Sequence, residues 1–238
     1  MADDPERVAT PQAYGIIMEN LPERKNYVAV ALGYVMIAGG TFYKLPQIIK
    51  IHRAQSAQGV SLASCVLAMT SQIFAAAYSV AEEHPFSAYG EAFPQFICTL
   101  AVALQCLRYN FYLSSAKLFQ GAGAGLTVAF VLCRLNLFLG HRLGRRAASA
   151  LQSSVPAITL FEKMPQVLQT WLDGSSGELS ISTNFLAWVG TMLRCYTSTK
   201  QLDGDRKALA PHAIGFLLNS SIMAQLLYYS RRKSVREP

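Results

Sequence analysis

Residues 44–48 read Lys-Leu-Pro-Gln-Ile, and residues 163–167 read Lys-Met-Pro-Gln-Val. The two prolines are separated by 165 − 46 = 119 positions, and this offset aligns further residues without a gap. It pairs Ser56 with Ser175, Val60 with Leu179, Ser61 with Ser180 and Leu62 with Ile181. A chance match of two short strings would not keep this register, so the chain contains an internal repeat.

The composition indicates lipid rather than water as the main solvent. Of the 238 residues, 52% are hydrophobic and only 15% are charged, against about 25% charged in an average soluble domain. The apolar residues fall into stretches close to the roughly 20 residues that a helix needs to cross a bilayer. We expect membrane-spanning helices over residues 27–51, 60–81, 89–113, 122–140, 147–171, 179–199 and 210–230.

The repeat and these spans predict an all-α membrane protein with seven transmembrane helices in a 3+1+3 layout. Residues 27–113 form one three-helix bundle, residues 147–230 form the second, and a linker helix covers 122–140. An odd number of spans would invert a directly fused copy, so the linker restores a parallel orientation. The polar segment 1–26 lacks the features of a secretory signal peptide, so we expect the first span to stay in the mature protein. A basic tail covers residues 231–238.

Pro46 and Pro165 fall inside hydrophobic helices, where proline removes a backbone donor and clashes with the preceding turn. We therefore expect a kink at each. The amides of Gln47 and Gln166 then satisfy freed carbonyl groups or face a cavity. A kink that serves only close packing is the alternative at either site. Recurrence at equivalent places in both halves favours a pair of hinges that gate a site between the halves.

Charged side chains inside spans cost about 2.5–3.5 kcal/mol on insertion scales and are candidates for function. Lys44 and Lys163 lie two residues before the repeated prolines, so a two-fold pair of ammonium groups can hold a phosphate. Alternatively, the lysines extend to the membrane interface, or Lys163 pairs with Glu162 or Glu91. Arg194 has no acidic partner four positions away in its own helix. It pairs with Glu91 or contacts a substrate phosphate.

Amide side chains in the last span complete the candidate site. Asn219 and Gln225 bind sugar hydroxyl groups or, as is commoner, bond helix to helix. The candidate substrate-binding residues are therefore Lys44, Gln47, Glu91, Lys163, Gln166, Arg194, Asn219 and Gln225. The 4 histidines and 5 cysteines are dispersed, and neither a phosphate-binding glycine loop nor a nucleophile with a base can be assembled. We expect no metal site, no cofactor and no enzymatic activity.

The formal net charge of +7 comes from basic residues in loops, at helix ends and in the tail. Anionic lipid headgroups are therefore the expected partner, rather than nucleic acid. The basic tail favours a cytosolic carboxyl terminus, which puts the acidic amino-terminal segment on the opposite side. Lys and Arg counts in the loops are nearly equal on both sides, so this orientation rests on the two ends of the chain.

The Pro-Gln motifs resemble the PQ-loop family, whose relatives include the SWEET sugar carriers and the cystinosin-like lysosomal exporters. Residues 85–92, Pro-Phe-Ser-Ala-Tyr-Gly-Glu-Ala, and residues 224–229, Ala-Gln-Leu-Leu-Tyr-Tyr, extend the likeness to one branch of the family. It covers roughly residues 30–230. The resemblance implies an endoplasmic reticulum membrane protein that binds dolichyl-phosphate mannose or glucose and moves or presents it for lumenal glycosylation.

Two other functions remain open. The first is a SWEET-like sugar or small-solute uniporter, which is disfavoured because Gln95 stands where an asparagine is expected to pair with Asn219. The second is an adaptor that holds glycosyltransferases without transporting anything. The exporters are less similar, because they use a membrane-embedded aspartate after the Pro-Gln motif, whereas Asp173 lies at the loop here.

Overall fold

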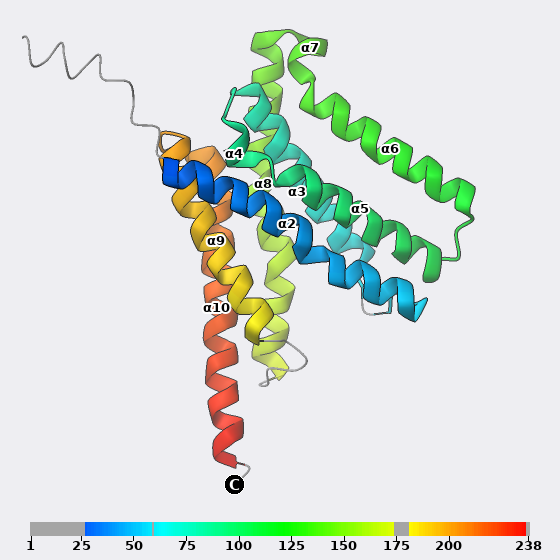
Figure 1. Cartoon of the computed structure of the whole chain (residues 1–238), viewed down its shortest axis with the longest axis vertical. Coiled ribbons are helices and arrows are strands. Elements are labelled where there is room, and N and C mark those ends of the chain that lie inside the picture. The colour runs from blue at the N-terminus through cyan, green and yellow to red at the C-terminus, as the bar shows by residue number, and fades with distance from the viewer. Residues whose placement is uncertain (1–26, 59, 174–180, 237–238) are drawn as a thin grey trace, which may run out of the picture.

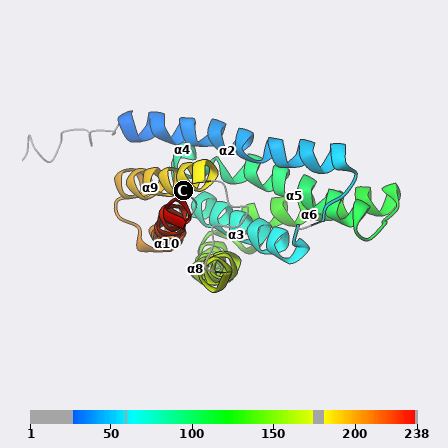
Figure 2. The same cartoon turned by 90° about the horizontal axis from the view of Figure 1, so that it is seen from below.

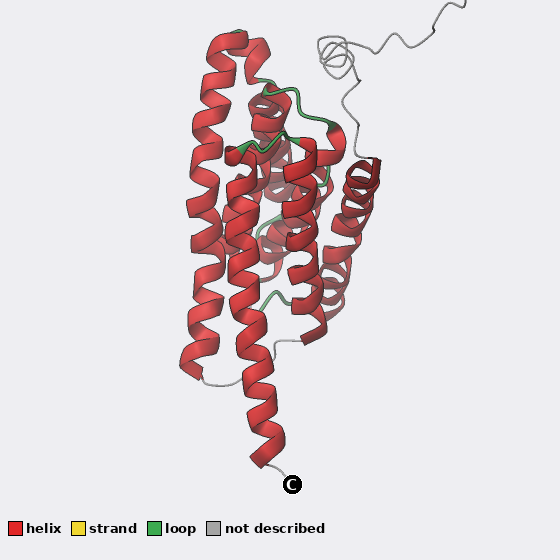
Figure 3. Ribbon diagram, turned by 90° about the vertical axis from the view of Figure 1, so that its left-hand side faces the viewer, coloured by secondary structure: helices red, strands yellow, loops and turns green. Residues whose placement is uncertain are grey.

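A computed structural model describes residues 27–58, 60–173 and 181–236, which are helical apart from short connections (Figure 3). The helices are α2 (Tyr27–Ala54), α3 (Leu62–Ala81), α4 (Phe86–Tyr89), α5 (Ala92–Tyr109), α6 (Ser115–Cys133), α7 (Leu135–Leu139), α8 (His141–Asp173), α9 (Ile181–Gln201) and α10 (Arg206–Arg236). The all-α class expected from the sequence is therefore confirmed for these residues.

Four helical segments are long and apolar enough to cross a membrane. They are Tyr27–Ala54, Leu62–Ala81, Phe86–Tyr109 and Ser115–Cys133. The 33, 21 and 31 residues of α8, α9 and α10 reach the length of a span, because 20 residues of helix extend about 30 Å. These three helices carry more polar and charged residues than the first four. The complete set of seven spans stays a prediction.

The helices of each half share one packing order. In the first half, α5 packs against both α2 and α3 and separates them. In the second half, α10 packs in the same way against α8 and α9. The third helix therefore lies between the first and second in both halves. The helices of the second half are inclined to those of the first (Figures 1 and 2).

The contacts between the halves follow the same symmetry. Helix α2 packs against α9, and α3 packs against α8, so exchanging the halves maps one contact onto the other. Ala29 and Ala148 are related by 148 − 29 = 119, and both are fully buried at 0% exposure. The Gln201 amide donates to the Ala29 carbonyl at 2.5 Å and accepts from the Ser87 hydroxyl at 2.6 Å. These bonds join the start of α2, the end of α9 and the segment after α3.

An ion pair marks the equivalent place in the other half. Arg145 near the start of α8 lies 3.6 Å from Glu82 at the end of α3, and Glu82 is related to Gln201 by 201 − 82 = 119. The first helix of each half therefore begins on the same face of the molecule. We call this face, where α2 and α8 begin and α3 and α9 end, the α2-start face.

The linker helix differs from its expected bounds of 122–140. It begins at Ser115 and ends at Cys133, where Arg134 breaks the helix with φ −114° and ψ 21°. Gly121 and Gly125, four residues apart, share one face of this helix, and that face lies against α5. A Cβ atom at these positions would lie 3.9 Å from Leu104 and 3.5 Å from Leu100, which is ordinary van der Waals contact, so the packing of α6 on α5 does not require glycine here.

Candidate functional site

Lys44 belongs to a polar triad that joins the three helices of the first half. Its ammonium donates to the Thr99 hydroxyl on α5 at 2.6 Å. The Gln72 amide on α3 donates to the same hydroxyl oxygen at 3.5 Å, while Thr99 donates to the carbonyl of Gln95 at 2.7 Å. The lysine is thus directed inward onto the third helix of its own half.

The second half contains an equivalent triad. Lys163 donates to the Asn219 side-chain oxygen on α10 at 3.1 Å, and the Asn219 amide donates to the Thr191 hydroxyl on α9 at 3.2 Å. The repeat offset relates Lys44 to Lys163, and it also relates Gln72 to Thr191, since 191 − 72 = 119. Sequence reasoning did not single out Thr99, Gln72 or Thr191. The 119-residue offset alone could have indicated that Gln72 and Thr191 are equivalent.

Both ammonium groups keep donors for a ligand. An ammonium group has three donors, and each lysine uses one in the hydrogen bonds between described residues. Lys44 and Lys163 are both half-buried. The Glu162 carboxylate acts on both. These three charged side chains are here called the lysine pair with Glu162.

The Pro-Gln residues lie beside this cluster. Both α2 and α8 continue through their prolines, Pro46 and Pro165. The Gln47 side chain is exposed and the Gln166 side chain is half-buried. Neither amide makes a hydrogen bond to another described residue, so the expected bonds to freed carbonyl groups are not formed there. The hinge role of the two prolines stays a prediction.

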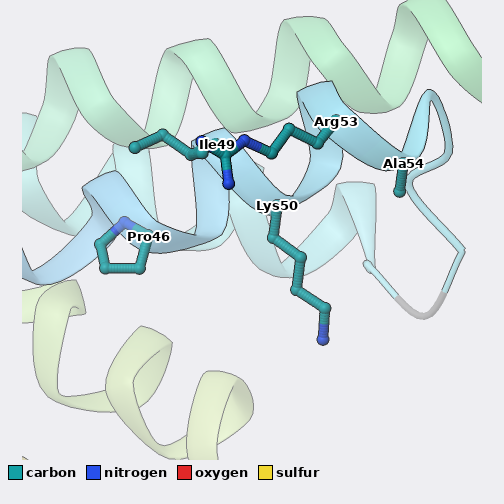
Figure 4. Close-up of a pocket in the computed structure, with 5 residues that line it drawn as sticks. All are labelled: Pro46, Ile49, Lys50, Arg53 and Ala54. Atoms are coloured by element: carbon teal, nitrogen blue, oxygen red, sulfur yellow. The ribbon is translucent and has the colours of Figure 1, made fainter.

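Pro46 also lines an open groove of about 720 Å³ at the end of α2, together with Ile49, Lys50, Arg53 and Ala54 (Figure 4). In Figure 4 the side chains of Lys50 and Arg53 extend in different directions. They do not converge on one point as a dedicated phosphate site would require. Lys44 does not line the groove. The groove is therefore separate from the lysine pair with Glu162.

Arg194 forms a buried ion pair with Glu91 across the two halves. Its Nη2 lies 2.6 Å from Glu91 Oε2, and its Nε donates to Oε1 at 2.9 Å. Its Nη1 donates to the Ala88 carbonyl at 2.9 Å. The residue is only 2% exposed. Of the two roles expected for Arg194, the structure shows the pair with Glu91, and a phosphate would have to displace that carboxylate.

The two amides of the last span differ in their surroundings. Besides its bonds to Lys163 and Thr191, Asn219 donates to the Ala187 carbonyl at 3.3 Å, so it bonds helix to helix. The Oε1 atom of Gln225 is buried and has no hydrogen-bond partner among the described residues. Asn219 bonds to Lys163, whereas the acceptor of Gln225 has no partner among the described residues.

A second polar cluster lies in the loops of the α2-start face. The Tyr78 hydroxyl donates to Asp205 Oδ2 at 2.8 Å, and His84 Nε2 lies 3.6 Å from the same oxygen. Burial lowers the pKa of His84, and the Asp205 and Glu82 carboxylates oppose this effect. Because Asp205 follows α9 and His84 follows α3, the cluster ties the two halves together.

The lowered pKa of His84 predicts a pH-dependent stability. As the pH falls below about 6.5, the unfolded chain binds the proton before the folded protein does. Stability is therefore greatest above this pH and decreases towards the lower pKa of the folded state. Thermal unfolding in detergent between pH 7.5 and 5.5 should show this decrease, and His84→Gln should reduce it. The matched control His141→Gln, at an exposed histidine, should show the same decrease in stability as the wild type. If His84→Gln lost as much stability between pH 7.5 and 5.5 as the wild type, the prediction would be contradicted.

Among residues 27–58, 60–173 and 181–236, no group of three or more His, Cys, Asp or Glu side chains is placed to hold a metal ion. Two acidic side chains contact basic or hydroxyl groups instead: Glu91 contacts Arg194 and Asp205 contacts Tyr78. The groups at the candidate site that can bind a ligand are therefore cationic and amide side chains, which form hydrogen bonds.

The long apolar helices define a multi-pass α-helical membrane protein. Within it, residues 28–88 match the family described as PQ loop repeat. This match spans α2 and α3 and includes Lys44 and the first Pro-Gln motif, so the chain contains a PQ-loop repeat. The second motif lies outside the match but shares the packing and triad of the first. No solved structure matches the chain.

Proposed function

We propose that this protein binds dolichyl-phosphate mannose or dolichyl-phosphate glucose in the endoplasmic reticulum membrane and moves or presents it for lumenal glycosylation. The PQ-loop repeat supports the broader class, because members of that family are typically transporters or carriers rather than enzymes. We further propose that all seven predicted spans cross the membrane, with the carboxyl terminus in the cytosol.

The lysine pair with Glu162 carries this proposal. Two ammonium groups and one carboxylate leave one net positive charge, which complements the single negative charge of a phosphodiester such as a dolichyl-phosphate sugar. A neutral sugar needs no such charge. In a low-dielectric interior each charge contact is stronger than in water, and charge-assisted hydrogen bonds are about twice as strong as neutral ones. The free donors of Lys44 and Lys163 are therefore suited to phosphate oxygens.

The sequence resemblance favours dolichyl-phosphate sugars among the possible phosphate-containing ligands. The strings at residues 85–92 and 224–229 resemble the mannose-P-dolichol utilization defect 1 protein, a PQ-loop member connected with dolichyl-phosphate sugars. In this arrangement the sugar lies toward Gln225, whose Oε1 is free to accept a hydroxyl hydrogen. Arg194 is not part of the phosphate site in this proposal, because Glu91 engages it.

The proposal predicts that Lys44→Gln and Lys163→Gln each weaken binding of a short-chain dolichyl-phosphate mannose about tenfold or more. A hydrogen bond to a charged group contributes about 1.5–3 kcal/mol, and 1.4 kcal/mol is tenfold in affinity. Binding is measured with a fluorescent analogue and purified protein in nanodiscs. Lys50→Gln is the matched control, because Lys50 is exposed on the same helix as Lys44.

The same variants in sealed liposomes separate the alternatives. Transbilayer movement of the fluorescent lipid supports translocation, and binding without movement supports presentation. Movement of free mannose or glucose without lipid binding would favour the sugar uniporter, and neither activity would favour the glycosyltransferase adaptor. Wild-type lipid binding by a folded Lys44→Gln, Lys163→Gln double variant would refute the phosphate site.

A further inference from the structure

A second cavity lies between α3, α5 and α6 and meets the first-half polar triad at one residue, Gln72. Its volume is about 500 Å³, within the roughly 300–1,000 Å³ of typical small-molecule pockets. Five aromatic side chains, Phe86, Tyr89, Phe93, Phe96 and Phe130, contribute to its lining. Most of the remaining lining is aliphatic, so the cavity suits a hydrocarbon chain.

Two polar groups mark the cavity. Arg134 lies at the carboxyl end of α6 and is exposed, and it forms no ion pair with any other described residue. Gln72 lines the cavity from α3, and its buried Oε1 has no partner among the residues that the structure describes. A ligand there would meet one unpaired cation at a helix end, the Gln72 amide oxygen, and mostly apolar side chains elsewhere.

The position of α6 indicates where such a ligand comes from. No residue of α6 is fully buried, and the helix lies at the edge of the assembly beside α5 (Figure 1). Its exposed large side chains include Leu126, Val128 and Phe130. In a membrane these side chains contact the surrounding lipid, whose headgroups lie at the level of the helix ends.

We propose that this cavity binds one hydrocarbon chain of an anionic phospholipid from the surrounding bilayer, with the lipid phosphate at Arg134. The aromatic side chains contact the chain, and the guanidinium donates to the phosphate oxygens, the geometry for which arginine is well suited. The lipid adds to the direct packing of the linker helix on α3 and α5. It does not depend on the function proposed for the lysine pair with Glu162.

Native mass spectrometry of the full chain, titrated with phosphatidylglycerol or phosphatidylcholine, tests this site. Wild-type protein should retain the anionic lipid more tightly. Arg134→Gln should weaken phosphatidylglycerol binding about fivefold, the effect of one basic group near a membrane surface. Ala129→Phe, which fills the cavity from α6, should abolish the tightly held lipid.

Two matched variants on the same helix serve as controls. Lys117→Gln removes an exposed cation near the other end of α6, and Ala124→Phe adds the same bulk at an exposed position outside the cavity. Both should bind phosphatidylglycerol as the wild type does, and thermal unfolding verifies that each variant is folded. Equal losses in Lys117→Gln and Arg134→Gln, or no loss in Ala129→Phe, would overturn the proposal. Tighter binding of a polyprenyl phosphate than of phosphatidylglycerol would overturn the choice of occupant.

Discussion

Arg194→Met is expected to destabilise the protein by about 3–5 kcal/mol, the usual cost of removing one partner of a buried ion pair. The variant leaves the Glu91 carboxylate, whose side chain is 15% exposed, without its cation. It also leaves the Ala88 carbonyl without its donor. Because Glu91 and Arg194 belong to different halves, the loss should loosen the contact between them. Unfolding of purified protein by titration with a denaturing detergent measures the effect.

Two comparisons make this prediction specific to the buried pair. Arg145→Met removes a cation from the more exposed pair with Glu82, where Arg145 is 42% exposed, and should cost about 0–1 kcal/mol. The double variant Glu91→Gln, Arg194→Met should be less destabilised than the sum of the single variants, because both disrupt one interaction. Equal costs for Arg145→Met and Arg194→Met would show that burial of the Glu91 pair has no energetic consequence.

Gly33→Ala is expected to destabilise the protein by about 1–3 kcal/mol, the range for overpacking a close contact. A Cβ atom at Gly33 would lie 2.3 Å from the Ser87 carbonyl oxygen, so α2 and the backbone before α5 would have to separate. The effect should extend to the ion pair, because the same Ser87 carbonyl lies 3.5 Å from Nη1 of Arg194. The same detergent titration measures it.

Gly39→Ala is the matched control on the same helix. A Cβ atom at Gly39 would meet no other atom within 4 Å. Alanine is a better helix former than glycine by up to about 1 kcal/mol, so this variant should be neutral or slightly more stable. If Gly33→Ala were as stable as Gly39→Ala, the close approach of α2 to Ser87 would not be part of the native packing.

The role of Arg194 illustrates a limit of the sequence. The sequence indicated a costly buried cation and named Glu91 and a phosphate as competing partners. It contains no distance between residues that are 103 positions apart, so the choice depended on how the second half packs on the first. Lys44 and Lys163 presented the same problem, since their contacts with Thr99 and Asn219 depend on the third helix of each half.

The sequence by itself determined the helical class, the 119-residue repeat and the equivalence of Lys44 and Lys163, because apolar periodicity and register are properties of the chain. It misplaced the linker helix, because glycine is a weak helix former and the glycine-rich stretch around Gly121 is nevertheless helical in the structure. Only the tertiary structure decided the triads, the Glu91–Arg194 pair and the cavity beside Arg134. Each of these depends on side chains from separate helices, whose distances are set by packing and not by any local property of the sequence.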